Sequence, residues 1–222
     1  MPLLDVDWKE RSGGPLAFLG VWAASVADAL NGQLPADRGF LAWVDTRSRQ
    51  ESVGAAARLG PPDGAAPTLV TPARFTDRVG VSVVEALEIR LAAAVVLFVT
   101  PDNKADSDAA LAFAVRASGF MSGGAGVVIV DALPGPASWA THLHSLTGVY
   151  PIARRPRGTD APILVVHPSA QGGAERFVVW HHAVAPGFPL PTVPVPVRGA
   201  MHLTLDLEAT YAEACRNSRL PE

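Results

Sequence analysis

Apolar residues recur along the chain with two different spacings, which predict its helices and its strands. A recurrence every three or four residues is typical of an amphipathic helix, whereas alternation or a short apolar run is typical of a strand. Helical spacing occurs in four segments: 15–33, 107–123, 136–147 and 206–219. Pro15 suits the first turn of the first helix, Ser107 is the expected N-cap of the second, and Asp206 is the expected cap of the closing helix.

Strand patterns fill much of the chain between these helices. They occur at 39–45, 51–57, 93–100, 126–131, 161–168 and 175–182. The runs 93–100 and 126–131 are apolar on both faces, as in central strands, and the helix between them predicts that they pair in parallel. The last two runs predict a hairpin. Residues 78–91 fit either a long strand or a strand that turns helical from Val84.

Proline-rich stretches interrupt this pattern twice. Residues 58–73 hold four prolines and predict a loop. Residues 186–197 hold five prolines, so we expect this arm to run extended over the surface rather than pair in the middle of a sheet, because proline lacks the N–H that pairing needs. With no internal repeat and no clear boundary, residues 1–222 predict a single α/β domain whose mixed central sheet is flanked by helices.

Composition narrows the classes of protein and partner. The 222 residues are 49% hydrophobic and 18% charged, which suits one folded domain with a sizeable core. A formal net charge of −3 gives no overall attraction to nucleic acid, although a local basic groove stays compatible with it. The single cysteine, Cys215, excludes an intrachain disulfide and is expected to be buried on the closing helix. The sequence has neither a signal-peptide layout nor an apolar run of membrane-spanning length, so a cytoplasmic protein without membrane contact is expected.

The strongest candidate for chemistry is the polar cluster that ends the run 93–100. The sequence VVLFVTPDNK places Asp102, Asn103 and Lys104 after that strand, at the strand end where α/β proteins often keep functional groups. Asp131 holds the corresponding place after the next strand, either as a site residue or as a turn former. A glycine-rich phosphate loop, a nucleophile elbow and a zinc-binding His-Glu-x-x-His helix are all absent from the sequence.

A lysine just past a central strand, with acids on adjoining strands, is the arrangement of metal-dependent nucleases. In such sites two carboxylates hold Mg²⁺ against the scissile phosphate, and the lysine stabilises charge or orients the attacking water. This chemistry needs a carboxylate on the strand itself. The strand here carries none, because Asp102 follows Pro101 in the turn.

Several stretches of the sequence, taken in order, resemble one family of proteins. They include MPLLD at the start and the segments 18–35, 95–106, 111–131, 190–197 and 205–221. Together they resemble a group of uncharacterised bacterial proteins with a restriction-endonuclease-like, PD-(D/E)XK core, related to the Uma-type endonucleases. The resemblance covers nearly the whole chain and implies the same core fold.

The resemblance also implies where catalytic residues would stand. It implies a glutamate on the central strand, where this chain has Leu97, and an aspartate on an upstream strand, where it has Ser52. Lys104 and Asn103 are kept, and Arg116 stands where a basic helix residue is expected. Relative to the family pattern, the chain therefore lacks both acids and retains the basic and amide groups.

Two hypotheses for function follow from this pattern. In the first, the chain is a catalytically degenerate relative, kept for binding or scaffolding, that needs no metal or cofactor; Lys104, Asn103, Asp102 and Arg116 are then the remnants of a pocket. In the second, it is an active Mg²⁺-dependent nuclease or phosphodiesterase in which Glu85 or Asp77 replaces the missing acids beside Lys104. The first is favoured, because loss of two carboxylates removes most of the charge that holds Mg²⁺.

The sequence leaves the partner and the oligomeric state open. The apolar arm at 186–197 is a candidate surface for pairing with a second copy of the chain, because extended apolar segments are usually covered.

Overall fold

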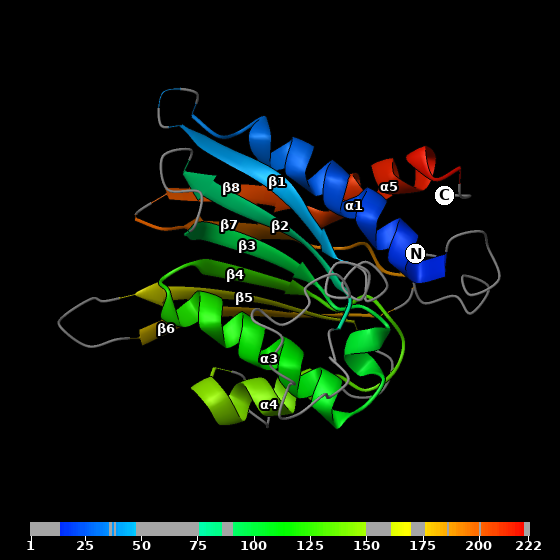
Figure 1. Ribbon diagram of the computed structural model, residues 1–222. Coiled ribbons are helices and arrows are strands. Elements are labelled where there is room, and N and C mark those ends of the chain that lie inside the picture. Colours follow the sequence, from blue (N-terminus) through cyan, green and yellow to red (C-terminus); the bar gives the residue numbers. More distant parts are fainter. Residues whose placement is uncertain are drawn as a thin grey trace, which may run out of the picture.

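The computed structural model has an α/β fold with a six-stranded mixed sheet at its centre (Figure 1). It describes residues 14–35, 37, 39–47, 76–85, 91–149, 161–169, 176–185, 187–199 and 201–219. Helices flank the sheet on both faces. The predicted class, a mixed α/β sheet flanked by helices, is therefore confirmed.

Strand order in the central sheet is β1-β2-β3-β4-β5-β6. These strands are β1 (Phe40–Arg47), β2 (Arg78–Glu85), β3 (Ala92–Phe98), β4 (Gly126–Val130), β5 (Ala161–Ser169) and β6 (Arg176–Val184). Neighbouring strands pair antiparallel, except β3 and β4, which are parallel. The predicted parallel central pair and the predicted hairpin of β5 and β6 are both confirmed. The expected strand at 51–57 and loop at 58–73 lie outside the described residues, as does 86–90, where the helical alternative for 78–91 would fall.

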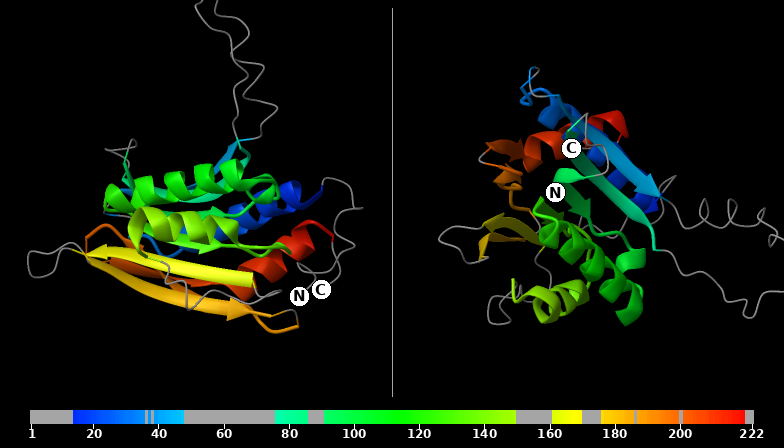
Figure 2. Two further views of the ribbon diagram at one scale, coloured as in Figure 1. Left: turned by 90° about the horizontal axis from the view of Figure 1, so that it is seen from below. Right: turned by 60° about the vertical axis from the view of Figure 1, so that its left-hand side comes forward.

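Among the residues that the structure describes, four α-helices cover the two faces of this sheet. They are α1 (Gly14–Asn31), α3 (Ser107–Ser122), α4 (Ser138–Thr147) and α5 (Leu207–Asn217). α1 and α5 lie on one face, and α3 and α4 lie side by side on the other (Figure 2). All four were predicted, and Asp206 caps α5 as expected. The predicted cap of α3 is wrong: Asp106, not Ser107, accepts a hydrogen bond from the N–H of Ala109, and its carboxylate also suits the positive helix end.

The second half of the proline-rich arm is a largely buried strand, which corrects the expectation that the whole arm runs over the surface; residues 187–189 are exposed, as expected. Strand β7 (Thr192–Val197) pairs antiparallel with β8 (Met201–Asp206) in a separate two-stranded sheet. A two-stranded ribbon needs only every second N–H of each strand, so Pro194 and Pro196 at alternate positions are compatible with it. The alternate valines of β7, namely Val193, Val195 and Val197, are at most 1% exposed.

The ribbon of β7 and β8 packs closely on the central sheet. A Cβ atom built on Gly126 of β4 would lie 1.8 Å from the carbonyl oxygen of Pro196, so β7 approaches β4 as nearly as two backbones can. The backbone N–H of Arg198 donates to the carbonyl of Ala93 on β3. The valines of β7 are thus covered within the chain, whereas Phe188, earlier in the arm, is 65% exposed, so pairing of the arm with a second copy stays a prediction.

Each face of the sheet has its own hydrophobic core. On the α1 face, Trp22 packs against Phe98 and Tyr211, with ring centroids 4.9 and 5.3 Å away, and its indole N–H donates to the hydroxyl of Thr210 on α5. Cys215 is buried in this core, as predicted. The other core lies between β3, β4, β5 and the helices α3 and α4. Among the described helices, none combines the length and apolar character that crossing a membrane requires.

Candidate functional site

The polar residues that follow β3 and β4 meet at the C-terminal ends of these two strands. We name Asp102, Asn103, Lys104 and Asp131 the Lys104 cluster. Lys104 lies at the end of the 3-10 turn η5 (Asp102–Lys104). Its Nζ is 2.8 Å from Oδ1 of Asp131 and donates to the carbonyl oxygens of Leu133 at 2.7 Å and Gly135 at 3.3 Å. An ammonium has three donors, so these contacts occupy all of them.

Asp131 is fully buried at the end of β4 and is held from both sides. Its Oδ2 accepts a hydrogen bond from the indole N–H of Trp139 at 2.8 Å, and Oδ1 accepts a longer one from the N–H of Leu133. Burial raises the pKa of Asp131 above its ordinary value, although the Lys104 ammonium and the hydrogen bonds act in the opposite direction. Asp131 thus joins the strand end to α4 and to η5, which is a structural role.

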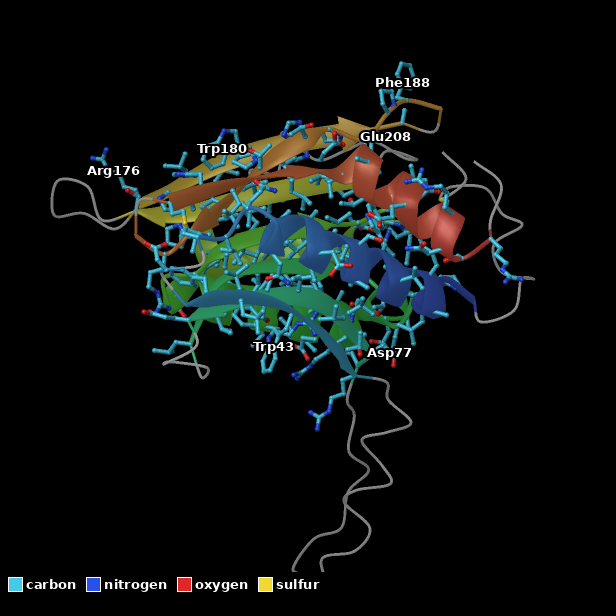
Figure 3. The ribbon with its side chains drawn as sticks, turned by 90° about the horizontal axis from the view of Figure 1, so that it is seen from above. Trp43, Asp77, Arg176, Trp180, Phe188 and Glu208 are labelled. Carbon is cyan, nitrogen blue, oxygen red and sulfur yellow. The ribbon has the colours of Figure 1, made fainter. Side chains whose placement is uncertain are left out.

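Asn103 and Asp102, the other two members of the cluster, connect the start of β2 to the end of β3 by hydrogen bonds. Asn103 Oδ1 accepts from the N–H of Thr100 at 3.0 Å, and its Nδ2 donates to the carbonyl of Asp77. Asp102 Oδ2 accepts from the backbone N–H of Asp77 at 3.0 Å. Asp77, which precedes β2 and is labelled in Figure 3, is therefore held at the Lys104 cluster by these hydrogen bonds. The polar side chains after β3 close a turn and link two strands.

Glu85, the other proposed replacement acid, lies at the opposite end of the sheet. β2 and β3 are antiparallel, so Val79 pairs with Phe98 beside the Lys104 cluster, whereas Glu85 ends β2 opposite Phe40. Seven residues of extended strand separate the two ends of β2, which is about 20 Å. The structure therefore separates Glu85 from Lys104, against the expectation that they converge. Ser52 lies outside the described residues.

The Lys104 cluster does not form a metal site by itself. The described residues contain no group of three or more His, Cys, Asp or Glu side chains placed to hold one ion. Asp102 and Asp131, the two acids of the cluster, are both engaged by N–H or ammonium donors. The described part of the chain thus brings Lys104 together with two carboxylates that already accept hydrogen bonds or an ion pair.

Leu97 and Arg116 line a second candidate site, a groove on the α3 face of the sheet. We name it the Arg116 groove; it is shallow and open to solvent on one side. Its lining residues are Asp45, Arg78, Val79, Gly80, Val81, Ser82, Leu97, Arg116 and Phe120. Arg116 lies roughly two and a half turns along α3 from Ser107, so the groove is distinct from the Lys104 cluster.

Arg116 is a charged side chain with incomplete hydrogen bonding. Within the part of the chain that the structure describes, its Nε and Nη2 atoms are buried without a hydrogen-bond partner, and its Cζ lies 5.3 Å from the ring centroid of Phe113. Burial, followed by repulsion from Arg78, lowers the pKa of Arg116 to about 10, while Asp45 acts in the opposite direction. The guanidinium therefore still carries its charge at neutral pH.

The sequence predicts some residues of the Lys104 cluster and of the Arg116 groove, but not all of them. Lys104, Asn103 and Arg116 were singled out, but Arg78 and Asp45 were not, because only the strand register brings them to Arg116. The pairing of Asp45 with Gly80, next to Arg78 along β2, depends on that register. Asp131 was noticed by its position after a central strand, but its contact with Lys104 was not predicted.

Comparison with known proteins adds no assignment to either place. No family model, no curated protein and no solved structure matches the chain. Any function is therefore argued from the residues themselves.

Proposed function

We propose that the chain is a non-catalytic binding protein built on a restriction-endonuclease-like core. The observation that carries this proposal is the state of Lys104, whose ammonium is fully occupied by Asp131 and by two backbone carbonyls. A catalytic lysine must instead direct its charge at a substrate phosphate or at the attacking water. Lys104 stabilises the fold at the place where a nuclease would use it for chemistry.

The identity of residue 97 supports the same proposal. Leu97 lies on a central strand, is 5% exposed and packs in the core under α3. The resemblance implies a metal-binding glutamate at this position, and a leucine removes both the ligand and its negative charge. Metal catalysis contributes several kcal/mol of transition-state stabilisation, and a lysine alone does not replace that contribution.

A cleavage assay tests the proposal directly. Purified protein is incubated with plasmid DNA, single-stranded DNA and RNA, each with Mg²⁺ or Mn²⁺. We expect no cleavage above a mock purification. Cleavage that co-elutes with the protein and disappears in a folded variant lacking Lys104 would overturn the proposal. The double variant Lys104→Met/Asp131→Leu serves here, because it removes both charges together and avoids an unpaired buried ion.

The same assay addresses the alternative, a Mg²⁺-dependent nuclease or phosphodiesterase. In that alternative Asp77 supplies the acid beside Lys104, because the 3.0 Å hydrogen bond from its N–H to the Asp102 carboxylate holds it at the Lys104 cluster. The variant Asp77→Asn would then abolish cleavage. Under the binding proposal, Asp77→Asn has no cleavage to abolish.

A further inference from the structure

The Arg116 groove lies on the part of the sheet that the helices leave open. α3 packs over β3, β4 and β5, and the α3 face of β1 extends beyond it. Alternation along β1 puts Ala42 in the α1-side core and directs Trp43 to the opposite face. Trp43 stays 46% exposed and projects from β1 on the side away from α1 (Figure 3). Its cross-strand partner is Ser82, which lines the groove.

Charge in this groove is unbalanced among the described residues that line it. They contribute two guanidinium groups, Arg78 and Arg116, and one carboxylate, Asp45. Burial is the main cause of the lowered pKa of Arg116; repulsion from Arg78 adds to it and acts more strongly than the opposing attraction to Asp45. Two like charges beside a core strand are unfavourable unless an anion joins them.

The atoms of Arg116 that lack hydrogen-bond partners indicate which kind of acceptor would bind there. Buried N–H donors without acceptors are rare in folded proteins, and each costs free energy. Nε and one Nη of a guanidinium form the fork that binds two oxygens of a phosphate or carboxylate at once. In Arg116 the atoms without partners are Nε and Nη2. They match a two-oxygen acceptor better than a single carbonyl.

We propose that the Arg116 groove binds a small ligand through a compact oxyanion, a phosphate or a carboxylate, held by the guanidinium groups of Arg116 and Arg78. This inference rests on the proposed binding function and names the class of its ligand. Ser82 offers a hydroxyl at the same place, and Gly80 adds no side chain to the floor of the groove. The exposed face of Trp43 lies next to it for a planar part of the ligand.

Charge favours a small ligand over a nucleic acid. The groove is shallow and open to solvent, and its positive charge comes from two neighbouring arginines. Nucleic-acid binding draws on many lysine and arginine contacts to successive phosphates. The chain carries a net charge of −3, and the described lining of the groove supplies two arginines against one aspartate.

Calorimetric titration of the full chain tests the inference. The probes are inorganic phosphate, pyrophosphate, adenosine monophosphate and malonate at millimolar concentrations; the first three carry phosphate and the last carries carboxylate. We expect one site per chain for at least one probe, and the probe that binds identifies the oxyanion. Affinity should fall about tenfold or more in Arg116→Met and in Arg78→Gln, because each removes charge-assisted hydrogen bonds. Arg116→Lys, which keeps the charge and loses the fork, should also bind more weakly.

Arg176→Gln is the matched control, because Arg176 is exposed on β6 at the other edge of the sheet. It should bind the probe like the unaltered protein. Absence of binding for all four probes, or binding that survives both Arg116→Met and Arg78→Gln, overturns the inference. Binding of a single-stranded oligonucleotide but of no small probe, lost in Arg116→Met, overturns it in favour of a nucleic-acid surface. These outcomes are separate from the cleavage assay, so the binding class can fail while the non-catalytic proposal stands.

Discussion

Lys104 Nζ lies 2.8 Å from Oδ1 of Asp131, and this ion pair joins the turn after β3 to the end of the parallel strand β4. Both side chains are nearly inaccessible, at 9% and 0% exposure. The pair lies at the C-terminal ends of β3 and β4, where α/β proteins commonly have their active sites. Because the two charges neutralise each other, neither is available for a substrate. The same contact therefore orders the segments after β3 and β4 and, under the proposed function, leaves no free lysine charge for catalysis.

Breaking this ion pair from one side should destabilise the fold strongly. Lys104→Met leaves the Asp131 charge buried without its cation, and removing one partner of a buried pair costs about 3–5 kcal/mol. The free energy of unfolding, measured by urea denaturation, should fall by that amount. The double variant Lys104→Met/Asp131→Leu should recover most of the loss, because no buried charge remains. A loss below about 1 kcal/mol in the single variant would contradict a buried pair.

The raised pKa of Asp131 predicts a specific dependence of stability on pH. The native state binds a proton at higher pH than the unfolded chain, whose aspartate has a pKa of about 3.9. Between the two pKa values the native state holds more protons, so the contribution of Asp131 to stability falls as pH rises. The difference in unfolding free energy between the unaltered protein and Asp131→Asn should therefore shift against the unaltered protein as pH increases from about 4. The opposite trend would mean that Lys104 outweighs burial.

Close approach of β7 to β4 should make Gly126 intolerant of any side chain. The Cβ of alanine would lie 1.8 Å from the carbonyl oxygen of Pro196, so one strand must move. We expect Gly126→Ala to lower the free energy of unfolding by about 3 kcal/mol or more, since overpacking against backbone is poorly relieved. Gly119→Ala on α3 is the control, because its Cβ meets nothing within 4 Å and alanine favours a helix. Equal stability of the two variants would show that β7 is not packed on β4.

Patterns within single segments predicted most of the fold, whereas contacts between segments were beyond them. The apolar run of β3 and the helical spacing of α3 are local features, so the sequence alone predicts both elements. Within the arm at 186–197, only residues 192–197 differ from the expectation, because the alternation of Val193 and Val195 with Pro194 and Pro196 favours a half-buried strand over a surface loop. The groove was missed because it requires the register of β1 on β2, which two largely apolar strands do not specify by sequence alone.

The hydrogen bond between Trp22 and Thr210 should matter for the α1–α5 contact. The Trp22 indole N–H donates to the Thr210 hydroxyl at 3.1 Å within the core. Thr210→Val keeps the shape and leaves that donor unsatisfied, which costs about 1–3 kcal/mol in unfolding free energy. Thr210→Ser retains the hydroxyl and should lose less. If the valine variant proves as stable as the serine variant, the indole N–H must find another acceptor.

Removal of the Arg116 charge should affect stability and binding in opposite directions. Arg116→Met keeps an unbranched apolar stem against Phe113 and eliminates two buried donors without acceptors. The ligand-free protein should be as stable as before or more stable by about 0.5–2 kcal/mol, as is common where a binding group is removed. Arg198→Met is the contrasting control. Its Nη2 donates to the carbonyl of Gly123 at 2.6 Å, so its removal should cost about 0.5–1.5 kcal/mol.

Urea denaturation of both arginine variants, with and without the oxyanion that binds, separates a ligand-binding arginine from a structural one. A ligand that binds only the native state raises the unfolding free energy in proportion to the logarithm of its concentration above Kd. The unaltered protein and Arg198→Met should both show this increase, and Arg116→Met should not. If Arg116→Met instead loses stability without ligand, Arg116 serves the fold, because its buried guanidinium must then be satisfied within the chain.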